Sequence, residues 1–382
     1  MTEKLYYTDA YIKEFSATVI SSEKTDGGYD TVLSKTAFFP EEGGQDSDHG
    51  RIGDARVLHV SEKDGVIHHL TDKALSGVVT CKLDFEERFD KMQCHTAEHI
   101  VCGIIHRLYG FENVGFHLGA DAVTFDVSGV IERESLPELE RLANIAVFEN
   151  LPVRAYFPSP SELSSLEYRS KSEIDGEVRI VTIGEVDSCA CCAPHVAATG
   201  EIGIIKLLDM MKHRGGTRFT LAAGMRALRD YQEKQESVRR ISGMLSTPRE
   251  EVADTLAEYM KETENLRFRN TGLENRLISL SADTIAELDG STVVFFEDLS
   301  YDALREICNK AMARVSGMLA AISGEEGAYR YVIASESVDM GSRIREINQA
   351  LDGKGGGRGK MVQGTFRSTA AAIKDYFSNI KD

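Results

Sequence analysis

The sequence lacks three features: a long apolar run, an export signal and an excess of positive charge. No stretch approaches the ~18 consecutive apolar residues that a membrane span needs. The first ten residues are polar and acidic, unlike the apolar core of a secretory signal. We therefore expect a cytoplasmic protein with no membrane partner. The 382 residues, 42% of them hydrophobic and 27% charged, exclude a largely disordered chain and predict two or three domains.

The net charge of −17 argues against a general duplex-DNA coating protein, because binding to phosphates needs a clustered positive field. The balance is nevertheless uneven. Residues 341–382 carry a net charge of +4, so the rest of the chain carries −21. A basic C-terminal segment on an acidic body suggests one localised anionic partner, although a solvated charged surface would have the same composition.

Composition and spacing predict an α+β protein with four parts. Residues 1–90 contain short β-branched runs separated by turn signals, which predicts a small β-barrel domain. Residues 91–220 alternate helix and strand, with a helix over 90–109 that ends at Gly110. Residues 221–288 are helical, and the simplest arrangement is a helical hairpin. Residues 289–382 return to α/β.

The second helical arm has a heptad pattern. Nine positions from Val252 follow steps of four and three residues, with Asn270 as a polar position that sets the register. The two arms can pack on each other or on a second subunit, so a homodimer through the helical or C-terminal region is one expectation. The seam positions are 252, 256, 259, 263, 266, 270, 273, 277 and 280.

Two histidine-containing pairs predict a metal site. His95 and His99 lie four residues apart on the predicted helix, so both imidazoles project from one face. Cys191 and His195 repeat this spacing, and the four residues together supply the nitrogen and sulfur ligands that zinc accepts. The neighbouring Cys189 and Cys192 are competing ligands; the choice of Cys191 depends on its spacing to His195.

Two glycine-containing segments are candidate binding sites. Gly43 and Gly44 directly precede Gln45, where adjacent glycines let backbone approach a ligand, although a tight hairpin turn would use the same residues. The run at 353–360 fails both the Walker and the dinucleotide patterns. As a flexible loop that carries Lys354, Arg358 and Lys360, it suits an RNA backbone better.

These motifs together resemble the editing half of alanyl-tRNA synthetase. The matching segments are Thr36-Ala-Phe-Phe-Pro with Gly43-Gly44-Gln45, His95-Thr-Ala-Glu-His99, Cys191-Cys-Ala-Pro-His195 and Thr199-Gly200. Lys354-Gly-Gly-Gly-Arg358 resembles that enzyme's C-terminal, DHH-associated domain. The order matches over essentially the whole chain, and we expect no aminoacylation domain in front, so the chain is similar to the long-form AlaX family. One departure is Cys-Cys-Ala-Pro-His where the synthetase typically has Cys-Gly-Gly-Thr-His.

The resemblance implies a trans-editing hydrolase that uses zinc to deacylate mischarged alanine tRNA, chiefly seryl-tRNA and secondarily glycyl-tRNA. In that reading, residues 91–220 are the zinc-binding editing domain and residues 289–382 bind tRNA. An alanine-sized pocket cannot strongly exclude a small analogue that adds a hydroxyl, so a second site must remove the error. Thr36 is the candidate that holds the serine hydroxyl, while Gln45 and the Gly43-Gly44 backbone would position the ester or the terminal ribose.

Two other classes of protein stay open at this stage. His95-x-x-Glu98-His99 is also the inverzincin protease pattern, although the Cys/His pair already completes the ligand set. A non-catalytic, zinc-stapled tRNA-binding module is the other alternative, favoured if Thr36 and Gln45 lie far from the metal.

Overall fold

The computed structural model describes residues 1–119, 123–170 and 176–380, and it is α+β, as predicted. The chain divides into two compact units, Met1–Arg240 and Ile241–Asp382, with the division inside helix α4 (Gly224–Leu245). In the described part of the chain, every helix is either too short or too polar to cross a lipid bilayer.

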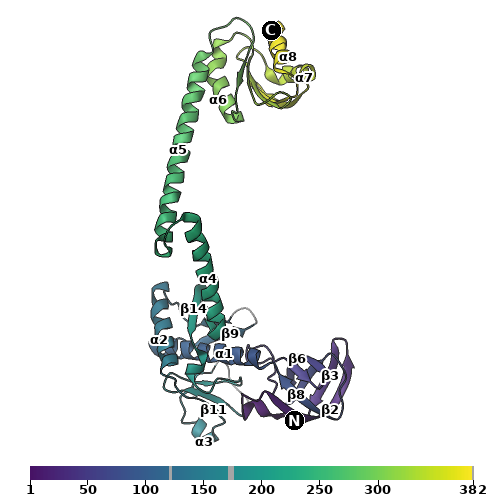
Figure 1. Ribbon diagram of the computed structural model, residues 1–382, viewed down its shortest axis with the longest axis vertical. Coiled ribbons are helices and arrows are strands. Elements are labelled where there is room, and N and C mark those ends of the chain that lie inside the picture. The colour runs from purple at the N-terminus through teal and green to yellow at the C-terminus, as the bar shows by residue number, and fades with distance from the viewer. Residues whose placement is uncertain (120–122, 171–175, 381–382) are drawn as a thin grey trace. The chain divides into compact units, whose positions relative to one another are not determined.

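The N-terminal strands of the first unit close into a barrel in the order β2-β3-β7-β6-β5-β8 (Figure 1). Alternating burial along β7, with Ile67 and His69 inside, is typical of barrel strands. The short strands β1 (Glu3–Lys4) and β4 (Lys35–Thr36) pair in parallel beside the barrel. The barrel strands are β2 (Glu14–Thr25), β3 (Gly28–Leu33), β5 (Gly50–Ile52), β6 (Ala55–Lys63), β7 (Val66–Thr71) and β8 (Val78–Leu83).

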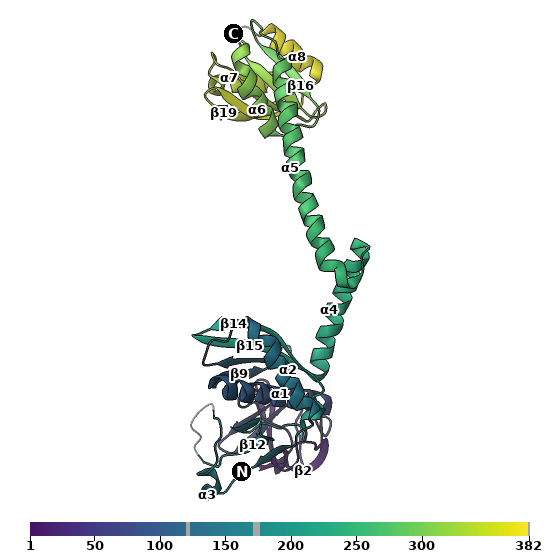
Figure 2. The ribbon, with the colours of Figure 1, turned by 90° about the vertical axis from the view of Figure 1, so that its left-hand side faces the viewer.

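Helix α1 (Phe85–Tyr109) is the central element of the rest of this unit. It ends at Gly110, whose φ of 69° gives the left-handed C-cap that glycine adopts without strain. A four-stranded antiparallel sheet, β14-β15-β10-β9, lies beside α1 and α2 (Figure 2), and a three-stranded sheet, β11-β12-β13, packs against α1 through β13. The remaining elements are β9 (Asn113–Leu118), β10 (Val123–Val127), α2 (Leu136–Phe148), β11 (Val153–Tyr156), α3 (Pro160–Leu163), β12 (Ile180–Ile183), β13 (Asp187–Ala190), β14 (Ile205–His213) and β15 (Gly216–Ala223).

Two long helices, α4 and α5 (Val252–Thr284), occupy the region expected to be helical. However, eight of the nine heptad positions are exposed, and only Val252 is buried. In the second unit, the described residues leave this seam exposed, so the packing of the two arms on each other stays a prediction. Packing on a second subunit stays a prediction.

The second unit contains a five-stranded sheet in the order β16-β17-β18-β20-β19, with one apolar cluster on each side. The glycine-rich run is not a loop: residues 353–358 form the edge strand β19, paired antiparallel with β20. A Cβ on Gly355 would lie 2.5 Å from the Tyr331 hydroxyl, so glycine is needed for this close packing. The elements are β16 (Thr292–Phe296), α6 (Tyr301–Ala311), β17 (Leu319–Ser323), β18 (Tyr329–Ala334), α7 (Met340–Ala350), β19 (Gly353–Arg358), β20 (Met361–Phe366) and α8 (Ala370–Asn379).

Candidate metal centre

One face of α1 carries four polar side chains into the interior of the first unit. Arg88, Lys91, His95 and His99 follow each other by three or four residues, and each is at most 3% exposed. The two basic side chains bind the segment that leaves the barrel: the Arg88 guanidinium donates to Asp48, and Lys91 Nζ donates to the Ser47 carbonyl at 2.7 Å. This docking places the barrel segment directly against the two histidines.

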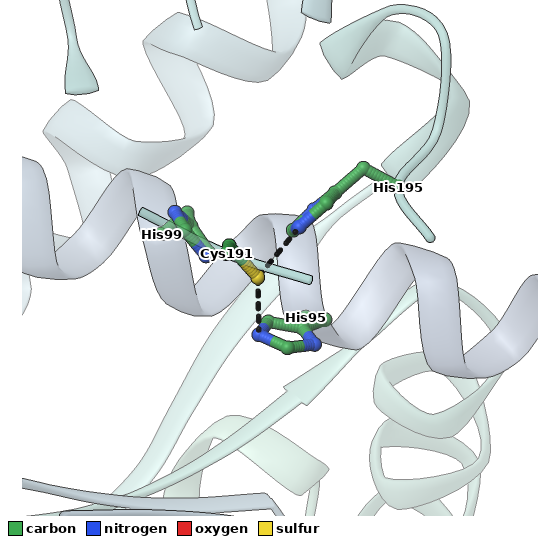
Figure 3. Close-up of side chains that lie close together, drawn as sticks. All are labelled: His95, His99, Cys191 and His195. Carbon is green, nitrogen blue, oxygen red and sulfur yellow. Dashed lines mark hydrogen bonds between the residues drawn. The ribbon is translucent and has the colours of Figure 1, made fainter. Parts of the chain in front are cut away.

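The segment after β13 brings Cys191 and His195 to the same place (Figure 3). Cys191 Sγ lies 3.3 Å from His195 Nε2 and 3.7 Å from His95 Nε2, and the ligand atoms of His95, His99, Cys191 and His195 all lie within 4.8 Å of one another. Zinc–sulfur and zinc–nitrogen bonds at the tetrahedral angle would separate S from N by about 3.6 Å. The donor set and its spacing therefore fit a tetrahedral metal ion.

The second nitrogen of His95 and of His99 is bound to an acceptor. His95 Nδ1 donates to Gln45 Oε1 at 2.8 Å, and His99 Nδ1 donates to Asp187 Oδ2 at 2.8 Å. The Asp187 carboxylate is itself held by the Arg169 guanidinium, at 2.8 and 2.9 Å. Because each Nδ1 carries the proton, the Nε2 lone pair of each ring is left for a metal.

His195 is oriented in the same way by a side chain of α1. The Thr96 hydroxyl donates to the Met92 carbonyl at 2.7 Å, so its oxygen accepts the Nδ1 proton of His195 at 3.0 Å. All three imidazoles thus have the tautomer that a metal ligand needs.

The three neighbouring cysteines have different surroundings. Cys191 alone groups with the three histidines, and Arg179 holds its loop by donating to the Cys191 and Ala193 carbonyls, both at 2.9 Å. Burial works against a Cys191 thiolate, but the adjacent His95 and His195 hold the pKa of the thiol well below its usual value. Burial raises the pKa of Cys189 to about 11.

Cys189 lies in a second group of donors, with His99 and Asp187, whereas Cys192 belongs to neither group. The Cys192 thiol instead lies beside the Glu42 carboxylate. The geometry therefore favours the Cys191 assignment over both competitors.

Gly43 and Gly44 form a tight turn with φ of 64° and 86°, closed by hydrogen bonds between Glu42 and Gln45. A Cβ on Gly44 would lie 2.2 Å from the Phe116 carbonyl oxygen, so this position requires glycine. The turn delivers Gln45 to His95. Gln45 is fully buried, and its Nε2 has no partner among the described residues.

Thr36 is placed differently from Gln45. Its fully buried hydroxyl lies 2.9 Å from His69 Nε2 and accepts the Phe38 amide proton at 3.1 Å. The structure thus brings Gln45, but not the Thr36 hydroxyl, into contact with the candidate metal ligands.

The three basic residues of the glycine-rich run lie in the second unit, on β19 or just beyond it. Lys354 and Arg358 are exposed on the edge strand. Lys360 follows the strand, and its ammonium pairs with Glu336. Two of the three charges are therefore presented on a strand rather than on a loop.

A cavity of about 400 Å³ opens beside the candidate metal ligands. Its lining includes both cationic and carboxylate side chains, and Arg179 lies under the Tyr7 ring at 5.2 Å. Such a mixture suits a zwitterionic or polar substrate better than an apolar ligand. The lining residues are Lys4, Tyr7, Glu42, Gly43, His95, His99, Phe157, Ser170, Glu177, Arg179, Cys189, Ala190, Cys191 and Cys192.

Sequence reasoning missed the supporting residues of this site. Asp187 and Arg169 occur in segments with no recognisable motif, whereas Thr96 lies inside the His95–His99 motif without being one of its predicted ligands. Only the structure shows that Asp187 binds His99, that Thr96 binds His195 and that Arg169 binds Asp187. The positions of Arg88 and Lys91 could have been predicted to share the face of His95 and His99, because they continue the same helical spacing toward the N-terminus of α1.

Comparisons with known proteins agree with the geometry. Residues 178–242 match the family model described as the threonyl and alanyl tRNA synthetase second additional domain. The chain is 27% identical to the alanyl-tRNA editing protein Aarsd1 of Rattus norvegicus and 26% identical to the alanyl-tRNA editing protein AlaX-L of Pyrococcus horikoshii. These alignments cover 97% and 98% of the chain, and 97% of each relative.

A third relative is longer than this chain. The alanine–tRNA ligase of Ignicoccus hospitalis is 30% identical over 94% of the chain, but the chain spans only 40% of that ligase.

Proposed function

We propose that this chain, a member of the long-form AlaX family of alanyl-tRNA editing proteins, hydrolyses the ester that joins a wrong amino acid, chiefly serine, to alanine tRNA. The observation that carries the proposal is the set of His95, His99, Cys191 and His195, drawn from two distant segments beside a polar cavity. The seryl ester is the main substrate and the glycyl ester a further one.

The proposed metal is zinc, held by those four residues, because three nitrogens and one sulfur are a ligand set typical of zinc. Zinc bound there supplies a Lewis acid that activates water or orients the substrate amine and carbonyl.

The chain's own residues prepare the site. Gln45 and Asp187 hold the ligand imidazoles, and the Gly43-Gly44 turn presents backbone beside Cys192 at the cavity wall. Gln45 Nε2, a buried donor without a protein partner among the described residues, is the group that we propose for a polar atom of the substrate.

The direct test is to incubate the full chain with alanine tRNA charged with serine or with alanine, and to follow the release of each amino acid. We expect serine to be released much faster than alanine. Tight tRNA binding with no ester loss would favour a non-catalytic tRNA-binding module. Cleavage of peptides without loss of the ester would favour a peptidase. The site supports a peptidase less well, because Glu98 lies outside the group of four candidate ligands and accepts a hydrogen bond from the Cys102 thiol at 3.3 Å.

Asp187 gives the first prediction. Asp187→Asn should weaken zinc binding about 10- to 100-fold, because His99 loses the carboxylate that fixes its orientation. Competition with a chromophoric chelator measures this affinity without reference to activity. Asp126→Asn is the matched control, since it removes a similar carboxylate–arginine pair, with Arg218, away from the metal ligands. Equal affinities in the two variants would contradict the assignment.

Thr36 remains the proposed holder of the serine hydroxyl, because it precedes the turn that carries Gln45. A serine hydroxyl would take the place of one of the two present partners of its oxygen, His69 or the Phe38 amide. Thr36→Val keeps the shape and removes the hydroxyl, so the ratio of serine to alanine release should fall roughly 5- to 150-fold. An unchanged ratio would show that the Thr36 hydroxyl only stabilises the barrel and does not contact the substrate.

We further propose that the second unit supplies tRNA affinity. Replacing both Lys354 and Arg358 by alanine should weaken tRNA binding and lower the slope of log affinity against log salt by roughly 1 to 2. A control with Lys24 and Lys63 replaced removes two exposed charges from the barrel hairpins and should leave the slope unchanged. Identical slopes in the two double variants would remove β19 from the tRNA-binding surface.

A further inference from the structure

The wall of the 400 Å³ cavity carries a carboxylate that the proposed reaction has not yet used. Glu42 directly precedes the Gly43-Gly44 turn, and both Glu42 and Gly43 line the cavity together with His95 and His99. Its carboxylate lies beside the Cys192 thiol, next in sequence to the candidate ligand Cys191. Glu42 is therefore held over the cavity that borders the metal ligands.

The cationic side chains around Glu42 bind other groups. Lys4 Nζ donates to both carboxylate oxygens of Glu62, at 2.7 and 2.8 Å. The Arg179 guanidinium donates to the Cys191 and Ala193 carbonyls. In residues 1–119, 123–170 and 176–380, no salt bridge to Glu42 is found. The Glu42 carboxylate thus lies in the cavity without a cationic partner.

Glu42 as a whole residue is exposed at the mouth of the cavity, but its carboxylate is partly withdrawn from water, which is unfavourable until a cation joins it. Consistent with this, burial raises the pKa of the Glu42 carboxyl, with a further contribution from Glu62, while Lys4 offsets only part of the effect. A ligand that brings a positive charge would relieve the penalty. An aminoacyl ester has one cationic group, its α-ammonium.

We propose that Glu42 binds the α-ammonium of the aminoacyl ester and thereby selects α-amino esters over neutral esters of the same shape. This inference rests on the proposed function, and it identifies Glu42 as the residue that determines specificity for the α-amino group. A carboxylate–ammonium hydrogen bond is charge-assisted and stronger than a neutral one. The anchored ammonium would orient the adjacent ester toward the metal ligands.

The test compares two esters of alanine tRNA: the seryl ester and the matching 2,3-dihydroxypropanoyl ester, in which a hydroxyl replaces the ammonium. Glu42→Gln should lower kcat/KM for the seryl ester roughly 10- to 100-fold and change that for the neutral ester less than about threefold. The preference of the wild-type chain for the charged ester should therefore largely disappear. Zinc content, measured for each variant, should stay at the wild-type value.

Two controls make the outcome specific. Glu41→Gln removes the neighbouring exposed carboxylate, 3.8 Å from His59, and should leave the preference intact. Glu177→Gln removes the other carboxylate of the cavity wall, and loss of preference there instead of in Glu42→Gln would overturn the assignment. Equal slowing of both esters by Glu42→Gln would also overturn it. If the wild-type chain released neither acyl group, the proposed function would fall, and this inference with it.

Discussion

Cys191→Ala should remove most of the bound zinc and slow serine release from seryl-tRNA by more than about 100-fold. The Cys191 sulfur groups with the three histidines, and it lies 3.3 Å from His195 Nε2 and 3.7 Å from His95 Nε2. Without it, three neutral imidazoles remain, and the thiolate that offsets the metal charge is lost. Elemental analysis of the purified variant measures the first effect, and a deacylation time course measures the second.

The adjacent cysteines are the matched controls for this change. Cys192→Ala should keep zinc near one per chain, because Cys192 faces Glu42 and lies outside both groups of candidate metal ligands. Cys189→Ala should also retain zinc, since its buried thiol keeps its proton. Undiminished zinc in Cys191→Ala would contradict the ligand set and transfer the assignment to Cys189.

Arg88→Ala should lower the free energy of unfolding of the first unit by about 3–5 kcal/mol, because it leaves the Asp48 carboxylate buried without its partner. Arg88 Nε donates to both Asp48 oxygens at 3.0 Å, and Nη2 donates to the Ala37 carbonyl. The same contacts dock the barrel segment on α1, so the variant should also loosen the contact between Gln45 and His95. Urea unfolding followed by far-UV circular dichroism is suitable, since the chain has no tryptophan.

An exposed ion pair on α2 provides the comparison. Arg141→Ala breaks the ion pair between Arg141 and Glu138, whose side chains are more than half exposed, and should leave the free energy of unfolding nearly unchanged. Replacing both Arg88 and Asp48 by apolar residues of similar volume should recover part of the loss. An Arg88→Ala protein as stable as Arg141→Ala would show that the buried pair does not hold the barrel segment.

The sequence predicted local features well where they depend on the spacing of apolar residues or on a single residue type. The spacing of apolar residues and the glycine at 110 define α1, and the i, i+4 pairs place the histidines on one face. The β-branched runs correspond to barrel strands β2, β3, β6, β7 and β8. These features depend on neighbours within a few residues, which the sequence displays directly.

Features that depend on distant contacts were not predictable. The run at 353–358 reads as a flexible loop because of its glycines, yet those glycines fit an edge strand against Gly364 and Tyr331. The partners of the ligand histidines, such as Asp187, lie 88 residues away from the histidine they hold. Likewise, a heptad pattern predicts that a helix has an apolar seam, but it does not predict which partner covers that seam.

Titration of zinc into metal-depleted full-length protein is the most direct test of metal-dependent ester hydrolysis by this chain. Serine release from seryl-tRNA should rise in proportion to added zinc and level off at one zinc per chain, while His95→Ala shows no such rise. Release at the full rate by the metal-depleted protein would contradict the claim.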